Sequence, residues 1–250
     1  LNKPYYQNLI RMTETQDSPF FFYDLDHLQN HLQYMNEHIE SGIKLWYACK
    51  ANPMSAILKI FRNLNFGIDI ASKGELDQVL RSGIKADGIL STGPAKSKTY
   101  LKSLLDNNVR IIVLESFQQA FDLNELSKDF KKKPKALLRI QLSWEGGKSI
   151  LGGENITPFG LGPCDWERYP IKSLTNIDIV GLHAFQWGNI LNLKELEYTW
   201  NETCQNLLKF AKKNEIQVEV LDLGGGIGIP YEKDQEAIDF SDVSKILFQL

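Results

Sequence analysis

A lysine directly follows an aromatic and apolar stretch near the start of the chain. Residues 44–49 read Lys-Leu-Trp-Tyr-Ala-Cys, which is typical of a buried strand, and Lys50 precedes the turn residues Asn52 and Pro53. We expect Lys50 to lie in a pocket, where desolvation disfavours its charged form. A free amine in a pocket can form a Schiff base with a carbonyl group. From this segment alone, a lysine that extends to solvent is the simpler explanation.

Three consecutive glycines, Gly224–Gly226, follow the apolar run 218–223. Glycine lets backbone N–H groups approach a bulky anion closely, and a cluster of such groups binds a phosphate. No Gly-Lys-Ser or Gly-Lys-Thr follows, so this is not a nucleotide P-loop. A glycine run alone is a weak signal. Together with a lysine that forms a Schiff base, it points to pyridoxal phosphate.

Two charged residues lie within apolar runs. Asp69 falls in the run 66–70 and Arg139 in the run 136–142. A buried carboxylate or guanidinium needs polar partners. A structural ion pair explains Arg139 about as well as a contact with a ligand does.

Glu75 and His183 each have a structural and a functional interpretation. Ser72 followed three residues later by Glu75 is a capping box at a helix start, and we weigh this role equally with one in the site. His183 ends an apolar run beside aromatic residues. It could stack on a planar cofactor, although a lone histidine of this kind is more often a satisfied core residue.

Short apolar runs alternate with helical patterns along the chain. We expect strands over 19–23, 44–49, 66–70, 88–90, 109–114, 136–142, 177–183 and 218–223, and helices over 25–39, 74–81, 98–105, 117–130, 193–213 and 242–250. This alternation predicts right-handed βαβ units and a parallel sheet. Without the first run there are seven βα units, whereas a closed barrel needs eight. Because an open parallel sheet exposes a long apolar edge, we predict an α/β fold, a TIM (β/α)8-type barrel that lacks its last strand.

Composition excludes several classes of function. The chain has 250 residues, of which 43% are apolar and 24% charged, with a net charge of −3. This gives no reason to expect nucleic acid or an anionic membrane as a partner. The three cysteines match neither a disulfide framework nor a metal site, which suits a reducing cytosol. No apolar run is long enough to cross a bilayer.

In combination, these motifs resemble the fold-type III pyridoxal-phosphate decarboxylases, which act on diaminopimelate, ornithine or arginine and share a barrel fold with alanine racemase. The resemblance runs from about Pro19 to the last residue and rests on five segments in the family's order and spacing: Tyr47-Ala48-Cys49-Lys50-Ala51-Asn52, Asp69-Ile70-Ala71-Ser72-Lys73-Gly74-Glu75-Leu76, Leu137-Leu138-Arg139-Ile140, Gly181-Leu182-His183 and Leu221-Asp222-Leu223-Gly224-Gly225-Gly226. It implies that Lys50 carries the cofactor, that Asp69 and Glu75 lie near the lysine and phosphate end, that Arg139 lines the pocket, and that Gly224, Gly225 and Gly226 hold the phosphate.

The chain departs from the family at several points. Phe185 stands where the family has the histidine that stacks on the pyridine ring, so either Phe185 or His183 would stack there. The family's Lys-Phe-Gly segment appears as Pro158-Phe159-Gly160. The last barrel strand, with its Glu-Pro-Gly-Arg segment, and the C-terminal β-domain are absent. We therefore expect residues 1–25 to hold a strand that joins that β-domain, and residues 26–250 to form an incomplete barrel.

The resemblance implies decarboxylation of an amino acid through a Schiff base on Lys50, in a cytoplasmic homodimer without a metal. The substrate would be diaminopimelate, ornithine or a carboxylated diamine, the last as in siderophore or antibiotic synthesis. Two alternatives stay open. One is a racemase or a single-domain cofactor-binding barrel, and the other is a non-catalytic homologue that regulates a true decarboxylase.

Overall fold

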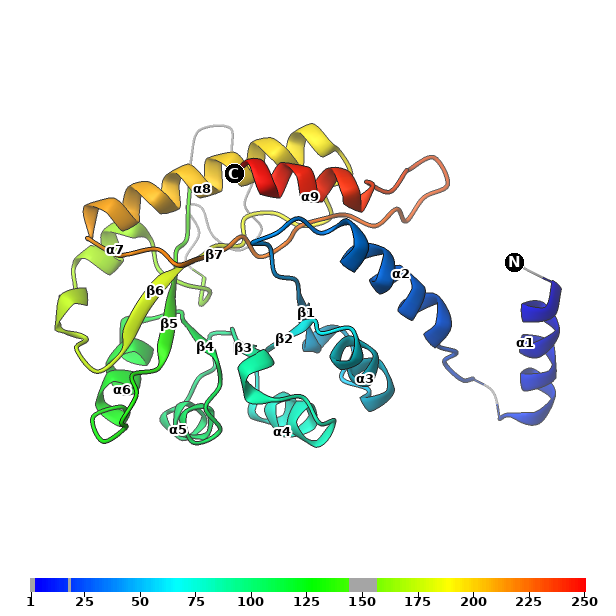
Figure 1. Ribbon diagram of the computed structural model, residues 1–250, viewed down its shortest axis with the longest axis horizontal. Coiled ribbons are helices and arrows are strands. Elements are labelled where there is room, and N and C mark those ends of the chain that lie inside the picture. Colours follow the sequence, from blue (N-terminus) through cyan, green and yellow to red (C-terminus); the bar gives the residue numbers. More distant parts are fainter. Residues whose placement is uncertain (1–2, 18, 144–156) are drawn as a thin grey trace.

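Seven parallel strands form the centre of the molecule. The computed structural model describes residues 3–17, 19–143 and 157–250. The strands pair in chain order from first to last and follow one another around an arc (Figure 1). They are β1 (Trp46–Ala48), β2 (Gly67–Ile70), β3 (Ile89–Ser91), β4 (Ile111–Leu114), β5 (Lys135–Arg139), β6 (Asp178–His183) and β7 (Val220–Asp222).

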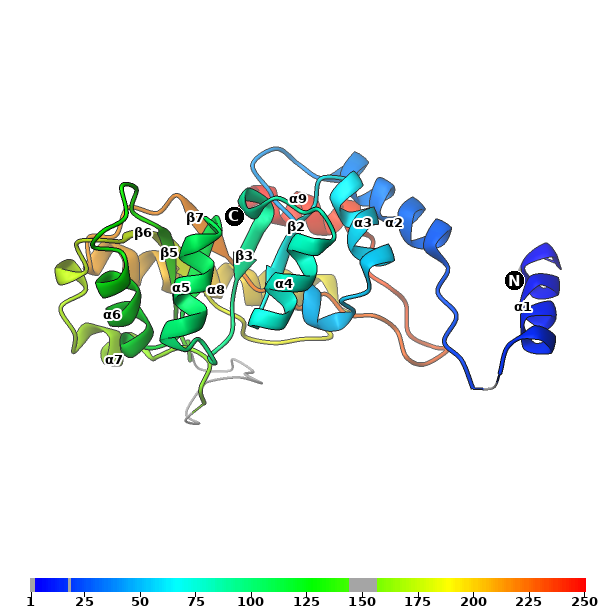
Figure 2. The ribbon, with the colours of Figure 1, turned by 90° about the horizontal axis from the view of Figure 1, so that it is seen from below.

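Helices alternate with the strands and cover the outer side of the arc (Figures 1 and 2). They are α1 (Lys3–Thr15), α2 (Leu25–His38), α3 (Ser55–Asn63), α4 (Lys73–Arg81), α5 (Lys98–Asp106), α6 (Phe117–Leu126), α7 (Pro163–Glu167), α8 (Leu193–Lys213) and α9 (Phe240–Gln249). Helix α1 projects away from the rest of the molecule in both views. The curled parallel sheet confirms the predicted α/β fold, a TIM-type barrel without its closing strand.

Polar N-caps set where several of these helices begin. Ser72, Ser97 and Ser116 each accept a hydrogen bond from the backbone N–H three residues later, at the starts of α4, α5 and α6. Each bond satisfies a donor that the first helical turn leaves unpaired. The carboxyl end of each preceding strand is therefore followed by a short turn that leads directly into the helix.

Side chains alternate between the two faces of the sheet. In β4, Ile112 and Leu114 pack in the main core against the helices, whereas Ile111 and Val113 belong to a separate apolar cluster on the concave face. That cluster also contains Leu90, Leu137 and Val180, with Trp46 and Val220 at its margin. Two residues farther along β5 and β7, Arg139 and Asp222 share this concave face.

Glycine at position 67 permits the close approach of β1 and β2 on the concave face. A Cβ atom at Gly67 would lie 2.3 Å from Cε3 of the Trp46 ring. The indole therefore lies directly over the backbone of β2. Asp69 lies two residues beyond Gly67 on the same face, so this packing fixes the strand that carries the carboxylate.

The first part of the chain packs on the last. The Tyr34 hydroxyl in α2 donates to the Asp239 carboxylate, 2.9 Å from both oxygens, and the Glu40 N–H donates to Ser244 Oγ at 2.9 Å. Tyr34 also packs against the small core that α8 and α9 share. These contacts hold α2 and α9 side by side, next to the end of the sheet where β1 begins.

The structure differs from the sequence expectations at three places. Helices α1, α3 and α7 were not predicted. The strand expected over 44–49 ends at Ala48, and Cys49–Ala51 form a 3₁₀ turn. Residues 19–23 form no strand with any described residue, and Phe21 is 89% exposed. A strand there needs a partner beyond the described residues, so its pairing with a further domain stays a prediction.

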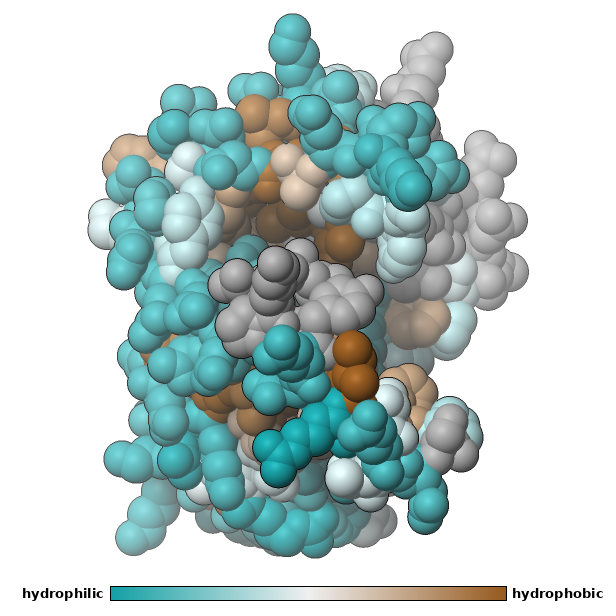
Figure 3. Space-filling model, turned by 90° about the vertical axis from the view of Figure 1, so that its right-hand side faces the viewer, coloured by the Kyte–Doolittle hydropathy of each residue, from teal (hydrophilic) through white to brown (hydrophobic). Residues whose placement is uncertain are grey.

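The surface is mostly hydrophilic on the side that carries α1, with hydrophobic residues visible in a hollow near its middle (Figure 3). Within the described parts of the chain, no helix is both long and apolar enough to cross a membrane.

Candidate active site

The residues that could take part in a reaction gather at the carboxyl edge of the sheet. Lys50 follows β1, Asp69 is the third residue of β2, Arg139 ends β5, His183 ends β6, and Gly224–Gly226 follow β7. In parallel barrels, this edge is where active sites lie. The structure therefore brings the predicted site residues from opposite ends of the sequence to one end of the sheet.

Lys50 is exposed, and the expectation that it lies in a desolvating pocket is wrong for this chain. The reason is local. The strand stops at Ala48, so that the strand alternation no longer sets the direction of residue 50, and the 3₁₀ turn buries Cys49 completely while leaving Lys50 open. The amine is consequently accessible to an incoming molecule.

Asp69 interacts electrostatically with charged groups near both ends of the open sheet. Its carboxylate accepts hydrogen bonds from the Thr92 N–H at 3.2 Å and the Thr92 hydroxyl at 3.0 Å. Burial raises the pKa of Asp69 to about 6; the bond from Thr92 opposes this, Asp222 adds to it, and His183 and Lys50 lower it. Asp69 therefore lies within electrostatic range of groups on β1, β6 and β7.

Glu75 has a well-defined structural role at the start of α4. Its Oε2 accepts from the Ala71 N–H at 2.7 Å, while its own N–H donates to Ser72 Oγ at 3.2 Å. These are the reciprocal bonds of a capping box, displaced by one residue on the carboxylate side. A role for Glu75 in the site stays a prediction.

Arg139 forms a buried ion pair with Glu115, which follows β4. Its Nη1 lies 3.2 Å from Oε1 and 3.1 Å from Oε2 of Glu115, and the two side chains are 7% and 0% exposed. The guanidinium also lies 5.0 Å from the centre of the Phe159 ring. Sequence reasoning missed Glu115, although a charged residue directly after the apolar run 109–114 was a usable signal.

Lys96, after β3, is also buried and was not singled out from the sequence. Its Nζ donates to the Gly93 carbonyl at 2.5 Å, and the Gly93 N–H in turn donates to Glu115 Oε1. Burial lowers the pKa of Lys96 to about 8, against the effect of Glu115 and Asp69. Lys96, Glu115 and Arg139 together form what we call the buried ionic cluster. No pattern in the polar stretch around Lys96 indicates its burial.

His183 pairs with Asp222 across β6 and β7. Its Nδ1 donates to the Asp222 carbonyl at 3.1 Å and lies 3.2 Å from Asp222 Oδ1. Burial raises the pKa of Asp222, but the His183 pair, the Gly224 N–H and Arg139 outweigh it and hold that pKa below its usual value. This is the satisfied histidine that sequence reasoning weighed against a stacking role.

The glycine turn after β7 has positive φ angles of 71°, 89° and 102° at Gly224, Gly225 and Gly226. A Cβ atom at Gly224 would lie 2.8 Å from the Phe185 Cβ, whereas nothing lies within 4 Å of that position at Gly225. The indole N–H of Trp200 in α8 donates to the Gly225 carbonyl at 2.9 Å. Within the described residues, the N–H groups of Gly225 and Gly226 donate to no acceptor.

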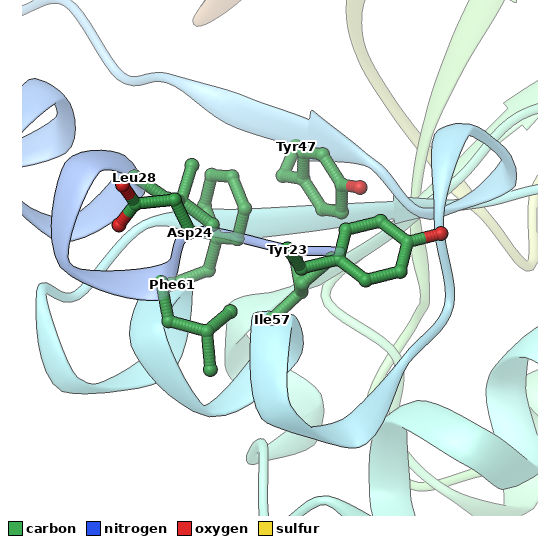
Figure 4. A pocket seen from close by; sticks show the side chains of 7 residues that line it. Tyr23, Asp24, Leu28, Tyr47, Ile57 and Phe61 are labelled. Atoms are coloured by element: carbon green, nitrogen blue, oxygen red, sulfur yellow. The ribbon is translucent and has the colours of Figure 1, made fainter. Parts of the chain in front are cut away.

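A separate apolar pocket lies between α2 and α3 (Figure 4). Tyr23, Leu28, Tyr47, Ile57 and Phe61 line it together with Asp24 and Leu25, and the Tyr47 and Phe61 rings stack at 3.9 Å. None of the predicted site residues lines this pocket. Across the described residues, no group of three or more potential ligands is placed to hold a metal ion.

Comparison with known proteins identifies a family and a fold that the chain matches. Residues 25–249 match the family model described as pyridoxal-dependent decarboxylase, pyridoxal binding domain. The chain is 25% identical over 237 residues to an L-glutamyl-[BtrI acyl-carrier protein] decarboxylase of Niallia circulans, covering 94% of this chain and 55% of the relative. It is 27% identical over 241 residues to a diaminopimelate decarboxylase of Campylobacter jejuni, covering 94% and 60%.

A solved structure of diaminopimelate decarboxylase from Helicobacter pylori, complexed with L-lysine, superposes with a TM-score of 0.81 at 24% identity, covering 98% of this chain and 62% of that one. At 24% identity, the structural similarity shows the fold alone. The chain spans 55–60% of the length of the two curated relatives named above.

Proposed function

Because the chain belongs to the family of pyridoxal-dependent decarboxylases, of which it is a pyridoxal-binding domain, we propose that it binds pyridoxal phosphate at the carboxyl edge of the sheet and serves an amino-acid decarboxylase. One observation carries the proposal. The N–H groups of Gly225 and Gly226, which donate to no acceptor among the described residues, lie at the same edge of the sheet as the exposed amine of Lys50. A phosphate accepts from such N–H groups, and the open space at Gly225 leaves room for it.

Lys50, the glycine turn and Phe185 have distinct tasks in this proposal. Lys50 would hold the cofactor covalently through Nζ, as a Schiff base, because its amine is accessible. Gly224–Gly226 would hold the phosphate. Phe185 fits the stacking role better than His183, because the Nδ1 atom of His183 is already bonded to Asp222, whereas Phe185 packs directly on the glycine turn.

The remaining groups orient the site and hold protons. When bound, pyridoxal phosphate supplies the acceptor for the electron pair that a broken bond to the substrate Cα releases. Arg139, fixed by Glu115, would present its guanidinium to the cofactor ring, and Asp69 would gain or lose a proton near pH 6, the value to which burial raises its pKa. Both tasks depend on side chains whose partners are in place before a ligand arrives.

The proposed substrate is a small amino acid, namely diaminopimelate, ornithine or a carboxylated diamine. The names of the relatives support an amino-acid or aminoacyl carboxylate as the group that is lost. We further propose a cytoplasmic homodimer, and that residues 1–25 contribute a strand to a domain outside this chain. Release of carbon dioxide from each candidate substrate distinguishes a decarboxylase from a racemase or a non-catalytic homologue.

The test of cofactor binding is a visible absorption band in the purified protein after addition of pyridoxal phosphate. We expect a band in the wild type and its loss in Lys50→Ala. Lys59→Ala, a change at another lysine of the next helix, α3, is the matched control and should keep the band. A wild type without the band, or a Lys50→Ala variant that retains it, would overturn the proposal.

A further inference from the structure

The loop after β3 is bonded to the strands on both of its sides. Toward β2, Thr92 donates through its N–H and its hydroxyl to Asp69. Toward β4, the Gly93 N–H donates to the Glu115 carboxylate, and the Pro94 carbonyl accepts from Gln119 Nε2 at 2.6 Å. A loop with this many side-chain partners has one orientation, and so do the groups bonded to it.

Glu115 is the shared acceptor at the centre of the buried ionic cluster. One of its oxygens accepts from the Gly93 N–H, and both lie within hydrogen-bond reach of Arg139 Nη1. Its own backbone N–H donates to Gln119 Oε1 at 3.0 Å. Because the carboxylate is held from several directions, the guanidinium bonded to it has little freedom to turn.

Lys96 is bonded to Gly93, the residue whose N–H Glu115 accepts from. Its ammonium donates to the carbonyl of Gly93. Gly93 has a φ of 94°, and a Cβ atom there would lie 3.2 Å from the Ala71 Cβ, so the position needs glycine. The single described acceptor of this ammonium is a carbonyl, which leaves donors unpaired on a buried cation. Such an arrangement is unfavourable for stability alone.

We infer that Lys96 and Glu115 are positioning residues that fix the orientation of the Arg139 guanidinium in the cofactor pocket, Glu115 by its direct bonds to Arg139 and Lys96 through Gly93 and Glu115. This inference rests on the proposed function, because that function supplies the cofactor that Arg139 would contact. The opposing interpretation is a purely structural ion pair. The two differ in one respect: positioning residues affect ligand affinity only while Arg139 is present.

The experiment is a thermodynamic cycle on the affinity of the purified protein for pyridoxal phosphate, measured by absorbance titration. Glu115→Gln should weaken binding about tenfold, the effect of one lost charged hydrogen bond. In an Arg139→Met background, the same change should alter the Kd by less than about twofold. Equal losses in the two backgrounds would show that Glu115 does not act through Arg139 and would overturn the inference.

Lys96→Met provides a second variant if Glu115→Gln fails to fold. We expect a loss of about fivefold alone and none beyond Glu115→Gln in the double variant, since Lys96 reaches Arg139 only by way of Gly93 and Glu115. The matched controls are Glu125→Gln and Lys128→Met, which break an exposed lysine–glutamate pair of the same kind and should leave the Kd unchanged. A Kd that Lys96→Met leaves unchanged in a folded protein would also overturn the inference.

The outcomes separate the two proposals. If the wild type binds no pyridoxal phosphate, the proposed function fails and the positioning role falls with it. If the wild type binds, with a band that depends on Lys50, and the Lys96 and Glu115 variants bind equally well, only the positioning role fails.

Discussion

The carboxyl edge of the sheet has a closed part and an open part. Around β3, β4 and β5, the side chains of the buried ionic cluster are withdrawn from solvent and bonded to one another and to Gly93. Around β1 and β7, Lys50 and Gly225 are exposed, and no described residue lies within 4 Å of a Cβ atom at Gly225. The groups proposed to orient a ligand are thus fixed in advance, whereas those proposed to attach it remain accessible.

The largest expected effect comes from breaking the closed part. Arg139→Met leaves the Glu115 carboxylate buried without its cation and should lower the free energy of unfolding by about 3–5 kcal/mol. Lys50→Met in the open part should change it by less than about 0.5 kcal/mol. Urea denaturation without cofactor measures both. Similar values for the two variants would contradict the division of the edge into closed and open parts.

A pH effect at Asp69 comes next. Because its pKa in the folded chain is raised to about 6, the folded state binds this proton more tightly than the unfolded state does. The stability that this proton provides is present below pH 4 and is lost as the pH rises through 6. Between pH 4 and pH 7, the free energy of unfolding of the wild type should therefore fall by roughly 2–3 kcal/mol relative to that of Asp69→Asn. A difference that is constant with pH would exclude the raised pKa.

The glycine turn provides a contrast within the open part. Gly224→Ala places a methyl group against Phe185 and should destabilise by about 2 kcal/mol. Gly225→Ala meets only the unfavourable positive φ, at about 1 kcal/mol. If the turn holds a phosphate, however, Gly225→Ala should weaken pyridoxal phosphate binding, because its methyl group would occupy the open space. Thermal denaturation and absorbance titration of both variants make the comparison.

The smallest expected effect concerns the bond between α8 and the turn. Trp200→Phe removes the donor to the Gly225 carbonyl and should cost about 1 kcal/mol in unfolding free energy. Trp166→Phe is the variant to compare with it, because it also removes one indole hydrogen bond, the one to the Arg139 carbonyl in the closed part. Only Trp166→Phe should disturb the closed part, so it should lower the free energy of unfolding more than Trp200→Phe does.

The order of elements and the end of the sheet that carries the site could be predicted from the sequence. Apolar runs identified the strands, and the residues that end them, Arg139 and His183, lie where a parallel fold must place them. The strand at Lys44–Cys49 was predicted too long, because an apolar cysteine continues the pattern into a turn that tertiary contacts impose. That single difference reversed the expected burial of Lys50.

The buried ionic cluster could be predicted only in part. Arg139 was evident, since a guanidinium in an apolar strand needs acceptors. Lys96 lies in a polar loop between β3 and α5, and it is buried where Gly93 of this loop meets Glu115, which follows β4. No local pattern encodes such a meeting. Helix α3 was also missed, although it begins at Ser55, shortly after the turn residues Asn52 and Pro53.

The contact between Tyr34 in α2 and Asp239, just before α9, has a consequence for how the chain folds during its synthesis. Its two partners are 205 residues apart. At about 5–20 residues per second, α2 leaves the ribosome roughly 10–40 s before its partner does. During that interval α2 can pack against α3 and the main core but not against α9, so part of its apolar face stays uncovered until α9 emerges.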